Sequence, residues 1–68
     1  MNRTPVTSSH LASVGWDANV LEVEFHGGSV YQYERVPQSV FADLMGASSR
    51  GQYLAQHVKD VYPYRRIG

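Results

Sequence analysis

The fold is decided by residues 21–33, which read Leu21-Glu22-Val23-Glu24-Phe25-His26-Gly27-Gly28-Ser29-Val30-Tyr31-Gln32-Tyr33. The first part alternates apolar with polar side chains, which is the pattern of a strand with one buried and one exposed face. Gly27-Gly28 supplies the positive φ angles of a tight hairpin turn. Residues 29–36 are rich in Val and Tyr and predict a returning strand. The centre of the chain is therefore expected to form a β-hairpin.

The residues before the hairpin predict one more strand. Residues 10–16 contain Leu, Val and Trp, and the turn-forming Asp17-Ala18-Asn19 follows them. Gly15 weakens this strand or marks a bulge in it. Residues 1–9 are mostly polar, with Ser, Thr, Asn and one Pro, and we expect a flexible N-terminal arm there.

Two apolar stripes at helical spacing follow the hairpin. Pro37 suits the first position of a helix, where its missing N–H costs nothing, and Gly46 can end that helix. Ser49 and Gln52 have the spacing of a capping box and start a second helix, which Pro63 stops. The stripes consist of Val40, Phe41, Leu44 and Met45 in the first helix and of Tyr53, Leu54, His57 and Val58 in the second.

The order of these elements is β-β-β-α-α-β, with a short last strand over residues 64–67. This order predicts an α+β fold, in which a helical pair inserted before the last strand covers one face of a small curved antiparallel sheet. An open barrel of the Sm or SH3 kind is one form that such a curved sheet can take. We expect a single domain over residues 10–68. Its expected core consists of Trp16, Phe25, Phe41, Leu44, Leu54 and Val58.

The composition narrows the function classes. The 68 residues include no cysteine, which excludes disulfides and thiolate metal sites. Basic and acidic side chains are equal in number, so the protein has no net positive charge that would attract nucleic acid. No apolar run approaches the roughly 20 residues that span a bilayer, and residues 1–9 hold no secretory signal. We therefore expect a cytoplasmic protein with no membrane partner.

The register of the central hairpin decides where Tyr31 and Tyr33 point. With a two-residue loop at Gly27-Gly28, both tyrosines lie on the exposed face, where they would offer a platform for stacking bases. With Ser29 added to the loop, Phe25 pairs with Tyr31 and both tyrosines enter the core, because one residue of register exchanges the two faces. We favour the core orientation, since a small domain needs the area of about 150–250 Å² that each aromatic side chain can bury.

Several of these residues together resemble the KTSC domain, a small domain that occurs at the C-terminus of some lysyl-tRNA synthetases and as a stand-alone bacterial protein. Tyr31-Gln32-Tyr33 is similar to the Tyr-x-Tyr motif of that family, and the likeness covers about residues 9–62. The other similar positions are Val14-Gly15-Trp16-Asp17, Leu21-x-Val23-x-Phe25-x-x-Gly28, Val36-Pro37, Ala47, Ser49-x-Gly51, Tyr53 and Val58-Lys59. The resemblance implies RNA binding only through the association with a tRNA synthetase.

Catalytic chemistry is not indicated by the sequence. The three histidines lack metal-ligand spacing, and there is no glycine-rich loop of the kind that binds phosphate. Glu22 and Glu24 lie about 7 Å apart at a rise of about 3.4 Å per residue, and such a pair is typical of the exposed face of a strand. We expect a domain that is not an enzyme and that needs no metal and no cofactor.

The basic and aromatic residues in the C-terminal third of the chain indicate a nucleic-acid-binding site. Residues 48–68 hold four basic side chains against one acidic side chain, and two tyrosines adjoin the last two arginines. Arg binds phosphate through two hydrogen bonds, and Tyr stacks on unpaired bases. We therefore expect a site for single-stranded or tRNA-like RNA. In this hypothesis Arg50, Lys59, Arg65 and Arg66 contact phosphate, while Tyr62 and Tyr64 stack on bases or support the site.

Two alternatives to RNA binding stay open. In the first, the four basic side chains are merely solvated and the two tyrosines pack under the helices. In the second, the domain is a protein-interaction module that assembles into a homodimer or a higher oligomer. Small size, zero net charge and a short last strand at a sheet edge favour such self-assembly.

Overall fold

The central hairpin sets the two faces of the sheet. The computed structural model describes residues 1–68, and in it β3 (Val20–Phe25) pairs antiparallel with β4 (Val30–Tyr33). Tyr31 lies opposite Val23 and Tyr33 lies opposite Leu21. Both tyrosines therefore share the face of the apolar side chains of β3, and the predicted core orientation is confirmed.

The loop of this hairpin differs from both expected forms. The Phe25 N–H donates to the Ser29 carbonyl oxygen at 2.9 Å, so that three residues, His26-Gly27-Gly28, form the loop. The two glycines have φ angles of 104° and 99°, which side chains with a Cβ rarely adopt. The predicted pairing of Phe25 with Tyr31 is wrong by two residues. The face is nevertheless correct, because a shift of two residues keeps every side chain on its side of the sheet.

Three further strands extend the hairpin into a five-stranded sheet. β2 (Leu11–Asp17) joins β3 through a two-residue turn whose residues have positive φ angles, β5 (Tyr64–Arg66) pairs with β4, and β1 (Thr4–Pro5) pairs with β2. The strand order follows the chain and leaves β1 and β5 at the edges, so the sheet is open. β1 lies in the segment for which no strand was expected, because a pairing of two residues leaves no periodic pattern in the sequence.

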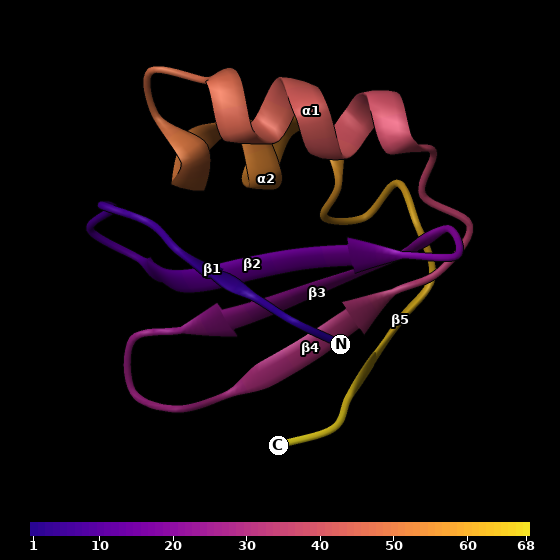
Figure 1. Cartoon of the computed structure of the whole chain (residues 1–68), viewed down its shortest axis with the longest axis horizontal. Coiled ribbons are helices and arrows are strands. Elements are labelled where there is room, and N and C mark those ends of the chain that lie inside the picture. The colour runs from indigo at the N-terminus through magenta and orange to yellow at the C-terminus, as the bar shows by residue number, and fades with distance from the viewer.

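Two helices cover the apolar face of this sheet (Figure 1). α1 (Gln38–Gly46) begins after Pro37, which is the N-cap rather than the expected first helical residue. α2 (Arg50–His57) begins after Ser49, whose Oγ accepts a hydrogen bond from the Gln52 N–H at 3.3 Å, as the capping-box spacing predicted. Neither helix has the length and apolar content that a bilayer crossing requires.

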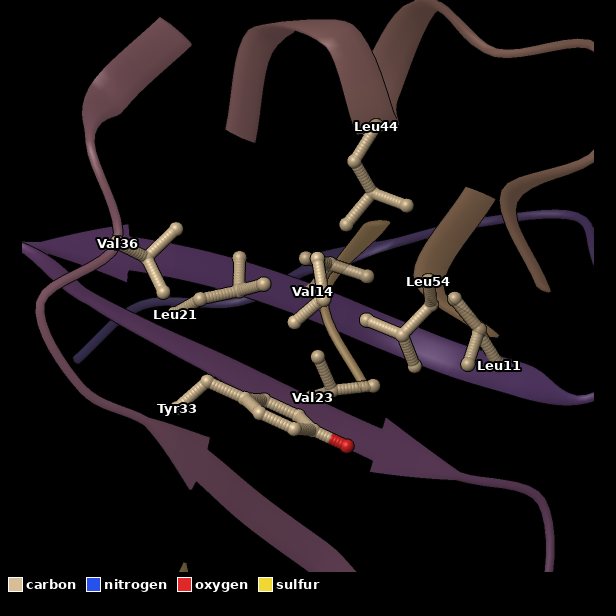
Figure 2. Packing of buried hydrophobic residues seen from close by; sticks show 9 residues of the cluster. Leu11, Val14, Leu21, Val23, Tyr33, Val36, Leu44 and Leu54 are labelled. Carbon is tan, nitrogen blue, oxygen red and sulfur yellow. The ribbon is translucent and has the colours of Figure 1, made fainter. Parts of the chain in front are cut away.

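The core lies between the helices and the sheet, where Figure 2 shows side chains from both layers in one cluster. Of the six expected core residues, Leu44, Leu54 and Val58 are buried. The three large aromatic residues of that set, Trp16, Phe25 and Phe41, are only partly buried and surround the cluster. Smaller aliphatic side chains fill the centre instead. The buried cluster consists of Leu11, Val14, Leu21, Val23, Tyr33, Val36, Leu44, Leu54 and Val58.

Candidate functional site

The two neighbouring arginines near the C-terminus lie on opposite faces of the sheet. Arg66 is opposite Tyr31 and therefore belongs to the helix-covered side, whereas Arg65 is opposite Gln32 on the other side. The Arg65 Nη2 donates to the Gln32 Oε1 at 3.4 Å. The Arg66 Nε donates to the carbonyl oxygen of Gly68 at 2.7 Å. One extended ligand strand cannot lie along both guanidinium groups on one face.

The other two expected phosphate ligands have different surroundings. Arg50 donates from Nη2 to the Met45 carbonyl oxygen at 2.9 Å and so satisfies a free carbonyl of the last turn of α1. Lys59 is exposed and follows the end of α2, next to Asp60. The structure therefore does not gather the four basic side chains into one patch, and it leaves Lys59 and Arg66 on the helix side of the sheet.

Three of the tyrosines lie close together, in contrast to the four basic side chains. Tyr64 of β5 stacks on Tyr31 of β4 with ring centroids 5.4 Å apart and an interplanar angle of 17°. Tyr33 lies 5.7 Å from the Tyr64 ring, and Phe25 meets Tyr31 edge to face at 5.5 Å. Tyr62, the other expected stacking residue, is partly buried and packs against the core. Cross-strand pairing places these rings side by side, a relation that the sequence alone does not reveal.

These rings line a pocket of about 540 Å³ between the sheet and α2, which we call the aromatic pocket. Leu54 and Ala55 of α2 and Leu11 of β2 complete its apolar lining. The polar side chains of the lining are His10, Ser29, Lys59 and Asp60. Sequence reasoning missed this pocket, although its Tyr-x-Tyr motif and Tyr64 were both singled out, because α2 supplies one wall.

The floor of the aromatic pocket contains an unpartnered hydroxyl group. Tyr33 is only 3% exposed, yet it lines the pocket, and no side-chain hydrogen bond of the protein uses its hydroxyl. Figure 2 shows its ring beside Val23 with the hydroxyl directed away from Val36. Burial raises the pKa of Tyr33, and negative charge on Tyr31, Tyr64 and Asp60 adds to the effect. At neutral pH the hydroxyl is therefore a hydrogen-bond donor.

The opposite face of the sheet is closed by a polar network. Arg3 forms an ion pair with Glu22 and donates from Nε to the Ser13 Oγ at 2.9 Å. Glu22 also accepts a hydrogen bond from the Gln32 Nε2 at 2.8 Å, and the Ser13 Oγ donates to Glu24 at 2.9 Å. The network consists of Arg3, Ser13, Glu22, Glu24, Gln32 and Arg65 and touches all five strands or their flanks.

The buried carboxylate of this network has a lowered pKa. The hydrogen bond from Gln32 is the largest cause, and Arg3 lowers the pKa further, while burial of Glu22 opposes both. Glu22 and Glu24 thus serve to hold the fold, and neither faces the aromatic pocket. No group of three or more His, Asp or Glu side chains is placed so that it could hold a metal ion.

Comparisons with known proteins agree over nearly the whole chain. The KTSC domain model matches residues 7–62. A KTSC domain protein of Yersinia pestis, known from its crystal structure, is 37% identical and superimposes with a TM-score of 0.92 over 98% of this chain and 97% of that one.

Two kinds of relative are found by sequence. A protein of Stutzerimonas stutzeri that carries no functional name is 43% identical over 98% of this chain and 99% of its own. A lysine–tRNA ligase of Nostoc punctiforme is 40% identical over 69% of this chain, which corresponds to only 8% of the ligase. The domain thus occurs both alone and as a small part of a much larger enzyme, and the chain belongs to the KTSC domain family.

Proposed function

We propose that this domain is a non-catalytic module that binds single-stranded RNA in the aromatic pocket. The observation that carries the proposal is the stacked pair of Tyr31 and Tyr64, since Tyr64 is 55% exposed at the edge of an apolar pocket. Exposed aromatic rings on a sheet stack on unpaired bases, with an effect of about 1–3 kcal/mol per base on substitution by alanine. Lys59 and Arg66 lie on the same side and supply the charge that phosphate needs.

The electrostatic part of this binding is small. If only Lys59 and Arg66 replace counterions on a single strand, the logarithm of the binding constant falls with the logarithm of salt concentration with a slope of about −1.4. Stacking therefore contributes more than charge to the free energy of RNA binding. A patch of four basic side chains would have given charge the larger part.

The occurrence of the domain in lysine–tRNA ligases supports RNA as the ligand class. An RNA ligand and a chain without cysteine both fit a reducing cytoplasm, which is where we expect the domain to act.

Fluorescence anisotropy with labelled RNA oligonucleotides at low salt tests this proposal with a matched pair of variants. Arg66→Gln removes a cation from the pocket side, and Arg65→Gln removes the neighbouring cation from the opposite face. We expect Arg66→Gln to weaken binding at least about 3-fold, Tyr64→Ala to weaken it about 10-fold or more, and Arg65→Gln to leave it unchanged. No binding at about 100 μM protein, or equal effects of the two arginine variants, contradicts the proposal.

A second candidate function is self-association through β5. This strand ends the sheet, and Val61, Tyr64 and Ile67 around it are 60%, 55% and 49% exposed. An open edge beside exposed apolar side chains favours pairing with another strand. Sedimentation velocity distinguishes the two candidates: a stable dimer that ignores RNA supports self-association, and a monomer that binds RNA supports the first proposal.

A further inference from the structure

The floor of the aromatic pocket carries polar groups that stacking alone does not use. Tyr33 is held firmly, since its backbone pairs with Leu21 and the residue is only 3% exposed. Its hydroxyl nevertheless has no partner in the protein. The hydroxyl is not one of the fully buried unpaired atoms of the protein, so it reaches the open space of the pocket, where it is free to donate a hydrogen bond to a ligand.

The pocket also contains a carboxylate. Asp60 lines the same pocket as the hydroxyl, and its negative charge makes the smallest of the four contributions that raise the pKa of Tyr33. The pocket therefore presents one donor, the Tyr33 hydroxyl, and one acceptor, the Asp60 carboxylate, between aromatic walls. A ligand that satisfies both must be planar and must carry an acceptor and a donor close together on one edge.

We infer that Tyr33 and Asp60 read the Watson–Crick edge of an unpaired nucleobase that is held against the aromatic walls of the pocket. This inference rests on the proposed function and deepens it. Every standard base carries neighbouring donor and acceptor groups on that edge, and these groups are free only when the base is unpaired. The different order of donors and acceptors on the four bases gives the pocket a base preference, and Tyr33 is a specificity-determining residue.

The test uses the intact domain and the four nucleoside 5′-monophosphates, with ribose 5-phosphate as the probe without a base. Chemical-shift titration of the isotope-labelled protein gives a dissociation constant for each probe. Tyr33→Phe removes only the hydroxyl and keeps the buried ring, so the fold should stay intact. Tyr62→Phe is the matched control, because it removes a tyrosine hydroxyl outside the pocket lining.

In the native domain we expect the four nucleotides to differ in affinity by about 10-fold from best to worst and ribose 5-phosphate to show no saturable shift. Tyr33→Phe should reduce the spread to less than about 3-fold, and Tyr62→Phe should leave it intact. The inference is overturned if the nucleotides do not bind, or if Tyr33→Phe preserves the base preference.

The outcome is separable from that of the proposed function. Nucleotide binding that depends on Tyr33, without binding of RNA oligonucleotides, supports the inference and rejects the RNA proposal. Binding of RNA that does not depend on Tyr33, with no nucleotide binding, rejects the inference and keeps the RNA proposal.

Discussion

The polar groups on the two faces of the sheet differ in whether they have partners within the protein. On the face crossed by the N-terminal segment, Arg3 and Glu22 form an ion pair that further side chains complete, and Glu22 keeps only 8% of its side chain exposed. On the helix-covered face, the hydroxyl of Tyr33 has no protein partner and opens into a pocket. Polar groups that complete one another stabilise a fold, whereas groups left incomplete are available to a ligand. The first face therefore stabilises the fold, and the second is the face on which we propose that the ligand binds.

A glycine explains how the first face is closed. Figure 1 shows the N-terminal segment crossing in front of β2 and β3, and the ion pair of Arg3 with Glu22 joins these layers. A Cβ placed on Gly15 would lie 2.7 Å from the Asn2 carbonyl oxygen. Gly15 is therefore the position where the backbone of the segment approaches the strand, rather than a mere weakness in it.

The largest expected effect is on the closed face, where Glu22→Ala should lower the free energy of unfolding by about 3 kcal/mol. The substitution leaves the Arg3 guanidinium without its buried counter-charge, and removing one partner of such a pair costs about 3–5 kcal/mol. The lower end applies because the Arg3 side chain is still 28% exposed. Urea denaturation measures the effect. Glu24→Ala is the control, since the Glu24 side chain is 34% exposed, and a loss equal to that of Glu22→Ala would contradict the prediction.

The second prediction concerns the close approach at Gly15. Gly15→Ala should lower the free energy of unfolding by about 1–2 kcal/mol, because the added methyl group displaces the backbone of the N-terminal segment. If the displacement acts by separating Arg3 from Glu22, the same substitution should cost less in an Arg3→Ala background. A double-mutant cycle in urea measures this coupling. Fully additive losses would show that the segment is not held by the ion pair.

The hairpin and the helical pair could be predicted from the sequence because their signals are local. Alternation over residues 21–25, two glycines and the Ser49 cap each act within a few residues, and the strand, the turn and the cap that they predict are confirmed in the structure. The expected exposure of the polar face was wrong for Glu22, which is buried under the Arg3 network. Even there the exact pairing was wrong, because the loop begins at His26 rather than at Gly27, which places Val23 opposite Tyr31. Face orientation was correct because an error of two residues does not change it.

The surfaces could not be predicted because they depend on distant contacts. Arg65 and Arg66 are adjacent in sequence, and only their place in a strand sends them to opposite faces. Arg3 pairs with Glu22 across 19 positions, and no pattern marks such a pair in one sequence. The aromatic pocket likewise needs α2, β4 and β5 together.

The third prediction separates stability from binding on the pocket face. Tyr64→Ala should lower the free energy of unfolding by only about 1 kcal/mol, because it removes one stacked contact with Tyr31 from a side chain that is half exposed. Thermal and urea denaturation measure this loss, which should be well below that of Glu22→Ala. A loss of about 3 kcal/mol would show that Tyr64 is a core residue, and its effect on RNA binding would then no longer report on the pocket.

The smallest expected effect is a pH dependence that originates on the closed face. Because the pKa of Glu22 is lowered in the folded domain from the ordinary value of 4.5, the unfolded chain takes up this proton first as the pH falls. The stabilisation from Glu22 is complete above pH 4.5 and declines below it until the pH passes the lowered pKa of the folded state. Glu22→Gln lacks this contribution, so its free energy of unfolding should decrease less steeply below that pH than that of the native domain. If the free energies of unfolding of the native domain and of Glu22→Gln change with pH in parallel, Gln32 and Arg3 stabilise a neutral side chain at position 22 as much as the carboxylate. The contrast between the two faces would then depend on packing instead of charge.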